Sequence, residues 1–112
     1  MAVSNVKENW SDDYVALLMD VTAVNDFIDM TFPTPIRSYT VQRTLGSGVT
    51  SATAVVRSTQ SFDQTPSVSF GTANTDTPVS SSSHLLRRAR IICTALGGTG
   101  TVQVAFVARR VR

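Results

Sequence analysis

The chain is poor in the residues that most often carry catalysis or hold metal ions. It has one cysteine, Cys93, and one histidine, His84, in 112 residues. A single cysteine excludes an intrachain disulfide and a cysteine-based metal cluster. Cys93 and His84 are the one thiol–base pair available, but Cys93 falls at an inward strand position, where we expect a small core residue. The sequence therefore predicts no enzyme: no catalytic residue, no metal site and no cofactor.

Long hydrophobic runs are also missing. No stretch approaches the roughly 20 apolar residues that a membrane helix needs. The first residues lack the basic start and apolar run of a signal peptide, because Lys7 and Glu8 precede the polar residues 11–13. We therefore expect a single domain that is synthesised inside a cell and has no membrane partner.

Charge is scarce, at 16% of residues, and unevenly placed. Residues 1–30 hold one lysine against six acidic residues, a net charge of −5, whereas residues 31–112 hold nine arginines against Asp63 and Asp76, a net charge of +7. The acidic segment could lie on its own body or on a neighbour, or these charges could simply be solvated. Nine arginines against a single lysine favour interfaces, because guanidinium groups make planar, bidentate hydrogen bonds.

What the chain has in quantity is hydroxyl groups and alternating apolar residues. Thirteen serines and fifteen threonines make up a quarter of the sequence, which favours strands and turns. After Pro33 and Pro35, apolar residues recur with a period of two, interrupted only by Arg43. The residues assigned to one face of their strands are Tyr39, Val41, Leu45, Ala52, Ala54, Val56, Ala89, Ile91, Cys93, Ala95, Val102, Val104, Phe106 and Ala108. The pattern predicts an all-β domain, an antiparallel β-sandwich of jelly-roll type.

Residues 1–24 differ in character from the sandwich domain predicted over residues 25–112. Ser11 followed by two aspartates resembles a helix N-cap, yet residues 14–24 also read as an extended apolar strand. We expect either a short helix or an extended arm. Between the predicted strands, residues 46–48 and 97–100 are expected to be tight hairpin turns, and residues 71–84 are expected to be a loop.

Six arginines come from the two strands that the predicted 97–100 hairpin would join. They are Arg87, Arg88, Arg90, Arg109, Arg110 and Arg112. If the hairpin brings its two strands together, these side chains form a patch that could contact phosphates. Few aromatic residues lie near them, however, and single-strand binders need aromatics on which bases can stack. We therefore favour an exposed edge that pairs with acidic groups of a neighbouring protein, with nucleic acid as the alternative.

The order of these segments resembles the small β-sandwich domains of tailed-bacteriophage virion proteins. The resemblance covers about residues 25–108 and rests on four stretches: the apolar residues 27–30, SYTVQ at 38–42, TAVVRS at 53–58, and LRRARI at 86–91 followed by a glycine-rich turn and TVQV at 101–104. Members of this group often carry an Asp-Gly-x-x-Trp turn where this chain has residues 58–63, without glycine or tryptophan. No functional residue is therefore carried over from that turn.

The resemblance implies a virion structural protein, and the lack of catalytic residues agrees with such a role. We expect a capsid decoration or cement protein, located in the virion, whose partner is the major capsid protein or another virion protein. Residues 1–24 would then reach a neighbour through the apolar anchors Trp10, Tyr14, Leu17 and Leu18. Homo-oligomers, with a trimer favoured, would suit a local three-fold axis. The alternatives are a tail, neck or fibre component, or a nucleic-acid-binding β-barrel.

Overall fold

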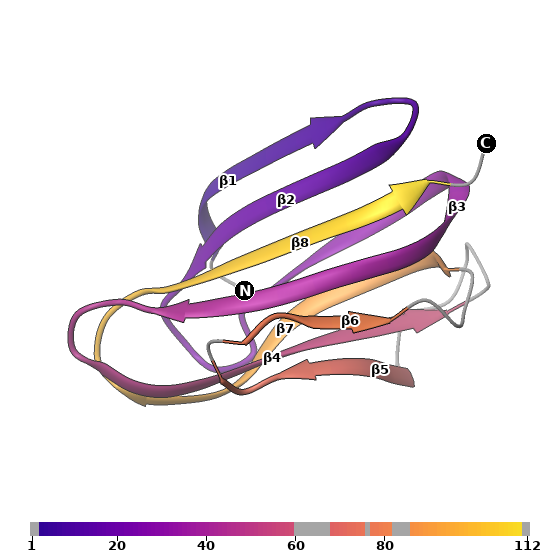
Figure 1. The fold of residues 1–112 in the computed structure, drawn as a ribbon. Helices are drawn as coiled ribbons and strands as arrows, with labels where there is room; N and C mark the ends of the chain where they lie inside the picture. The colour runs from indigo at the N-terminus through magenta and orange to yellow at the C-terminus, as the bar shows by residue number, and fades with distance from the viewer. Residues whose placement is uncertain (1–2, 60–67, 76, 82–85, 111–112) are drawn as a thin grey trace.

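The computed structural model describes residues 3–59, 68–75, 77–81 and 86–110, and every regular element in them is a β-strand (Figure 1). The strands are β1 (Val3–Trp10), β2 (Tyr14–Val21), β3 (Phe27–Leu45), β4 (Val49–Thr59), β5 (Val68–Ala73), β6 (Val79–Ser81), β7 (Leu86–Gly98) and β8 (Val102–Arg110). All ladders are antiparallel. The predicted all-β, antiparallel sandwich is confirmed. In the described part of the chain, no helix has the length and hydropathy needed to cross a membrane.

The long strand β3 belongs to both layers of the sandwich. Its first part, residues 27–31, pairs with β7, and its second part, residues 36–45, pairs with β8. Pro33 and Pro35 fall in the irregular stretch between Thr31 and Ile36 of the β3–β7 ladder, so their missing N–H groups interrupt no regular pairing. The first sheet therefore contains β1, β2, β8, the second part of β3 and β6 (Figure 1). The second sheet contains the first part of β3 with β7, β4 and β5.

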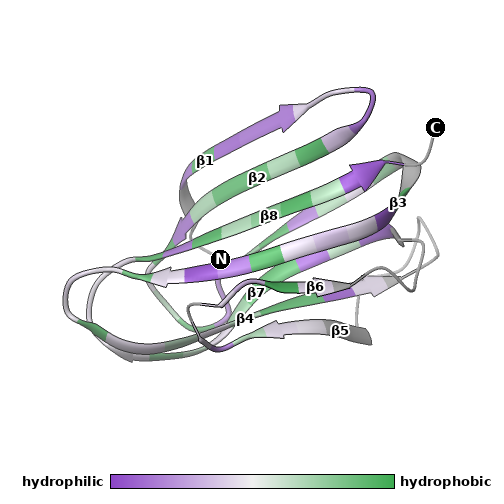
Figure 2. Ribbon diagram, in the orientation of Figure 1, coloured by the Kyte–Doolittle hydropathy of each residue, from purple (hydrophilic) through white to green (hydrophobic). Residues whose placement is uncertain are grey.

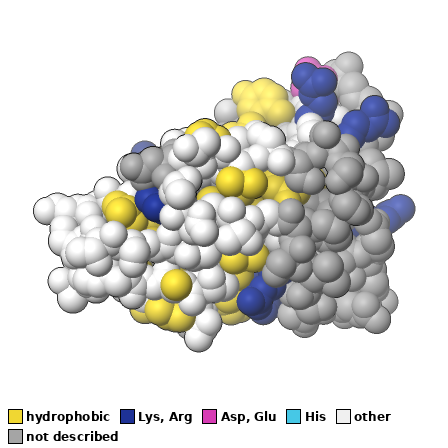
Figure 3. All heavy atoms as spheres, turned by 60° about the horizontal axis from the view of Figure 1, so that its bottom comes forward, with side chains coloured by type: hydrophobic (Ala, Val, Ile, Leu, Met, Phe, Trp, Pro, Cys, Tyr) yellow, Lys and Arg dark blue, Asp and Glu magenta, His cyan; other side chains and the backbone are white. Residues whose placement is uncertain are grey.

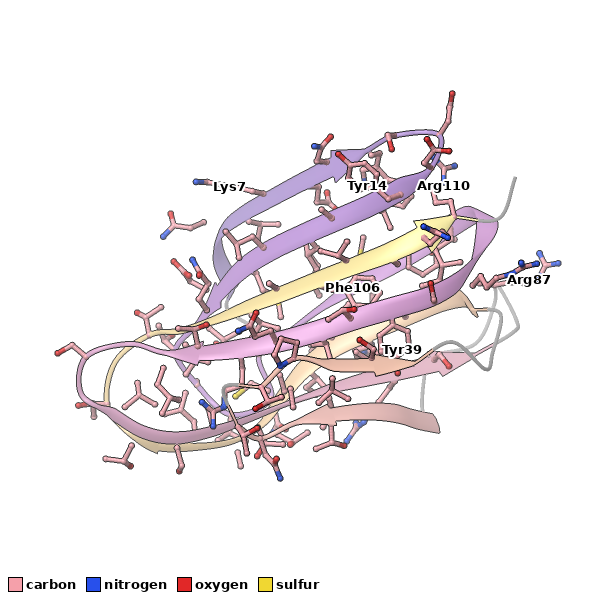
Figure 4. The ribbon with its side chains drawn as sticks, in the orientation of Figure 1. Lys7, Tyr14, Tyr39, Arg87, Phe106 and Arg110 are labelled. Atoms are coloured by element: carbon pink, nitrogen blue, oxygen red, sulfur yellow. The ribbon has the colours of Figure 1, made fainter. Side chains whose placement is uncertain are left out.

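Apolar side chains from alternate positions fill the space between the sheets. Tyr39 and Phe106 stack there with ring centroids 5.6 Å apart, one above the other in Figure 4. In Figure 2, β2 and β8 are green over much of their length and β8 ends in a purple arrowhead, whereas β1 is mostly hydrophilic. The predicted inward residues are buried, with the exception of the partly buried Leu45 and the exposed Ala95. Ala95 faces outward because the register shifts by one residue after Cys93.

Two glycine-rich connections close one end of the sandwich by joining the two sheets. The amide of Gly46 donates to the carbonyl of Thr101 (2.9 Å), and the amide of Thr99 donates to the carbonyl of Gly48 (3.0 Å). A Cβ atom on Gly48, whose φ is +89°, would lie 2.4 Å from the Thr99 carbonyl oxygen, so only glycine fits. The predicted hairpins are therefore wrong: in the described residues β7 pairs with β3 and β4, while β8 pairs with β2 and β3.

Arg43 does not break the inward pattern of β3. Its side chain is only 6% exposed and lies at the inward position that the alternation assigns to it. Nε donates to the carbonyl of Ala52 on β4 (3.0 Å), and Nη2 donates to the carbonyl of Asn74 (2.8 Å). Because backbone carbonyls accept its hydrogen bonds, the guanidinium can be buried, and it links the first sheet to the second.

The N-terminal segment is part of the sandwich, which corrects the expectation of a separate unit over residues 1–24. Of the two alternatives the chain is extended rather than helical, and β2 lies between β1 and β8. Alternate residues of β2, from Val15 to Val21, are buried in the common core. The loop expected over residues 71–84 also contains structure, because β5 runs to Ala73 and β6 pairs with β3.

Candidate functional site

The described residues hold no cluster of three histidine, cysteine or acidic side chains that could bind a metal ion. Cys93 is buried, and burial raises the pKa of its thiol, as does the negative charge of Asp26 to a smaller extent. Asp26 is itself engaged in the turn before β3, where its Oδ2 accepts hydrogen bonds from the amides of Thr22 and Ala23. His84 lies outside the described residues. Cys93 and Asp26 are buried parts of the fold, so the outer faces are the candidate sites.

The outer face of the first sheet has an apolar centre, and we call it the apolar face. It is formed by the outward residues of β2 and β8. A hollow of about 280 Å³ lies over Ala16, Leu18, Ala105 and Val107, and β1 contributes Lys7, Glu8 and Asn9 to its rim. Val107 is 47% exposed, although β8 is a central strand of the sheet. Exposed apolar side chains at the centre of a sheet face are typical of a docking surface.

A second hollow of about 400 Å³ continues this face across β8 toward β3 and β6. It shares Val107 with the first hollow and adds hydroxyl groups and a cation. Its other lining residues are Tyr14, Ser38, Tyr39, Thr40, Ser80, Ala108 and Arg109. Tyr14 is 42% exposed, and a tyrosine and an arginine beside an aliphatic centre are the residue types that most often anchor protein interfaces. The two hollows therefore form one continuous surface with an apolar middle and a polar rim.

The structure separates the four predicted anchors of residues 1–24. Tyr14 and Leu18 face outward on the apolar face. Leu17 is only 2% exposed and belongs to the core, so it cannot be an anchor for a partner. Trp10 is 39% exposed and stands at the end of β1, where its ring packs against buried Phe32 with centroids 5.9 Å apart.

Arg110 fixes the turn between β1 and β2 to the end of β8. Its Nη1 donates to the carbonyl of Ser11 (2.6 Å), and its amide donates to the carbonyl of Asp13 (2.8 Å). Its guanidinium carbon lies 5.5 Å from the centre of the Trp10 ring, within reach of a cation–π contact. Figure 4 shows Arg110 beside Tyr14 at this end of the molecule. The role of Arg110 is therefore internal, and it is not a free contact for a partner.

The remaining predicted arginines do not form one patch. Because β7 and β8 lie in different sheets, Arg88 and Arg90 face outward from the second sheet and Arg109 faces outward from the first. Arg87 projects from the end of the sandwich (Figure 4), and Arg112 lies outside the described residues. In the view of Figure 3, lysine and arginine side chains appear as separate spots, and acidic side chains appear only at the upper edge.

The outer face of the second sheet carries an ionic row that the sequence did not reveal, and we call it the arginine face. The row consists of Asp29 on β3, Arg90 on β7 and Arg57 on β4, which lie side by side. Arg88 is the next residue of β7 on the same face. Arg90 Nε and Nη2 donate to Asp29 Oδ1 and Oδ2 at 2.7 and 2.9 Å. This hydrogen-bonded carboxylate raises the pKa of Arg90 above its ordinary value. The guanidinium also lies 3.8 Å above the ring of Phe27.

Sequence reasoning missed Arg57 and Val107, the residues that best define the two faces. The alternation placed both residues outward, but it did not say which strands lie next to each other. Only the strand order brings Arg57 opposite Arg90, and only the pairing of β2 with β8 brings Val107 close to Leu18.

Comparison with known protein families, with curated proteins and with solved structures finds no significant match for this chain.

Proposed function

We propose that the protein is a non-enzymatic structural protein of a tailed-bacteriophage virion that decorates or cements the outer shell. It docks on the major capsid protein, or on another virion protein, through the apolar face. The observation that supports docking is the pair of hollows around Val107, where exposed apolar side chains are surrounded by hydroxyl groups, Lys7 and Arg109. The virion assignment rests on the resemblance of residues 25–108 to small virion sandwiches.

The placement of the arginines weakens the alternative of nucleic-acid binding. A basic track for a phosphate backbone needs several cations on one continuous surface. Here Arg109 and Arg90 face opposite sides of the sandwich, and Asp29 neutralises Arg90. The exposed aromatic ring of Tyr14 lies on the other face from Arg57, Arg88 and Arg90.

The test compares two valines that are equally exposed. Val107 lies at the centre of the apolar face and is 47% exposed, whereas Val24 lies in the turn before β3 and is 46% exposed. Purified protein is mixed with shells assembled from the major capsid protein encoded in the same genome, and the bound fraction is measured by sedimentation. Burial of a valine contributes about 1.5 kcal/mol, so Val107→Ser should weaken binding about tenfold, and Val24→Ser should leave it unchanged.

A cryo-EM map of intact particles distinguishes the possible positions. Density for the sandwich on the shell, with the apolar face turned toward the capsid protein, is the expected result. Density in the tail, neck or fibre would keep the docking role and move its location. Particles and shells that never retain the protein would overturn the proposed function.

A further inference from the structure

Two guanidinium groups and one carboxylate lie side by side at the centre of the arginine face. Arg57 and Arg90 occupy adjacent strands, and the carboxylate of Asp29 is bound by Arg90. Arg57 lies directly opposite Arg90 across the β4–β7 ladder. Like charges in directly opposed positions of a sheet are destabilising. A second carboxylate beside Arg57 would relieve this repulsion.

The face already displays the way in which it binds a carboxylate. Asp29 receives two parallel hydrogen bonds from Arg90, the bidentate geometry that arginine makes with carboxyl groups. Phe27 supports the guanidinium from below, at 3.8 Å. Because β3, β7 and β4 are hydrogen-bonded neighbours, the backbone of Arg57 is fixed beside this pair. The chemistry on this face therefore selects an acidic protein segment.

The chain itself presents such a segment at the turn between β1 and β2. Asp12 and Asp13 are exposed there. The turn is preorganised, because Ser11 Oγ accepts hydrogen bonds from the amides of Asp13 and Tyr14, and Arg110 holds the Ser11 carbonyl. In Figure 1 the turn lies at the free end of the β1–β2 hairpin, and β8 and the second part of β3 separate it from β7. The turn therefore cannot reach the arginine face of its own molecule.

We propose that the acidic β1–β2 turn of one copy of this chain docks on the arginine face of a second copy, so that copies associate head to tail. The two surfaces are different, so the contact is heterologous. Repetition of a heterologous contact closes into a ring, such as a cyclic trimer, or grows into a filament. This inference goes beyond shell docking and uses the opposite side of the sandwich, so either can fail without the other.

Charge exchange between the two surfaces gives the sharpest test. Arg57→Asp and Asp12→Arg are prepared separately, and self-association is measured by analytical ultracentrifugation at low salt. Each variant alone should associate at least tenfold more weakly than the parent chain, because one of its two surfaces now repels the other. An equimolar mixture should recover association, because Asp12 of the first variant meets Arg57 of the second, and the two exchanged residues also attract each other.

The matched control is Lys7→Asp, which makes the same charge change at the rim of the apolar face, away from the turn, and should leave self-association unchanged. Thermal unfolding of each variant establishes that it is folded. A parent chain that remains monomeric at millimolar concentration would overturn the proposal. The same conclusion follows if Arg57→Asp associates as the parent does, if Lys7→Asp is equally damaging, or if the mixture fails to recover. Shell binding by the Val107→Ser variant is measured separately and reports only on the apolar face.

Discussion

The two outer faces of the sandwich are built on the same kind of backbone but carry different chemistry. The apolar face has aliphatic side chains at its centre and single charges at its rim. The arginine face has an ion pair and two further guanidinium groups across adjacent strands. An apolar surface gains free energy by burial, which salt affects little, whereas an ionic surface weakens as salt rises. We therefore expect the two proposed contacts, shell docking on the apolar face and self-association on the arginine face, to respond differently to salt.

The largest loss of stability is expected when the interior that supports both faces is damaged. Phe106→Ala deletes a fully buried ring that stacks on Tyr39, and should cost about 3–5 kcal/mol of unfolding free energy. Urea unfolding followed by circular dichroism measures the loss. Val107→Ala, one residue along the same strand but exposed, should change stability by less than about 0.5 kcal/mol. Equal effects of the two substitutions would show that β8 does not have the predicted inward and outward sides.

A smaller loss is expected when the polar link between the sheets is removed. Arg43→Met keeps much of the side-chain volume but leaves the carbonyls of Ala52 and Asn74 without their donor. An unsatisfied buried polar group costs about 1–3 kcal/mol. Arg37→Met changes an exposed arginine of the same strand and is the control. If Arg43→Met proves as stable as the parent in urea, the buried guanidinium does not stabilise the contact between the sheets.

A substitution on one face alone sharpens the comparison. Asp29→Asn removes the carboxylate bound to Arg90, but the pair is partly exposed, with side chains 31% and 20% accessible, so the loss of stability should stay below about 1 kcal/mol. The arginine face becomes more positive, so head-to-tail association should strengthen at low salt. Binding to shells through the apolar face should not change. A parallel change in both kinds of binding would mean that the two faces are not independent.

The smallest effect is expected at Cys93, which lies in the interior and touches neither face. Burial raises the pKa of its thiol, so the folded chain holds this proton more tightly than the unfolded chain does. The contribution of this shift to the free energy of unfolding is fully present below the unfolded pKa of about 8.5. It is lost as the pH rises above that value and through the raised pKa of the folded chain. Cys93→Ala should abolish this part of the alkaline decline in unfolding free energy. A decline that is unaltered by the substitution would have to come from other groups.

Most of the inward-facing residues were predictable from the sequence, because alternation is a local property of a strand. Val104 and Phe106 are separated by one outward residue, and any antiparallel pairing keeps them on the same side. Arg43 also followed the alternation, although its charge made it look like an interruption. What made its burial possible, two carbonyls from distant parts of the chain, is not visible in the local pattern.

The partners of each strand were less predictable. A glycine-rich turn between two apolar runs usually predicts a hairpin, and Gly97–Gly100 instead carries the chain from one sheet to the other. The error moved Arg109 away from Arg90 and divided the predicted basic patch between opposite faces. The sequence at Ser11, with two aspartates after it, fits a helix start as well as a turn between strands. A serine that caps a helix can also close such a turn.

The shared strand β3 has a mechanical consequence. Load that reaches the first sheet passes along the covalent backbone of β3 into the second sheet, across the proline-containing segment, without depending on contacts between side chains. Tension along β3 would load the ladder with β7 in the second sheet and the ladder with β8 in the first sheet. Tension between partners bound on the apolar face and on the arginine face would therefore pass through β3.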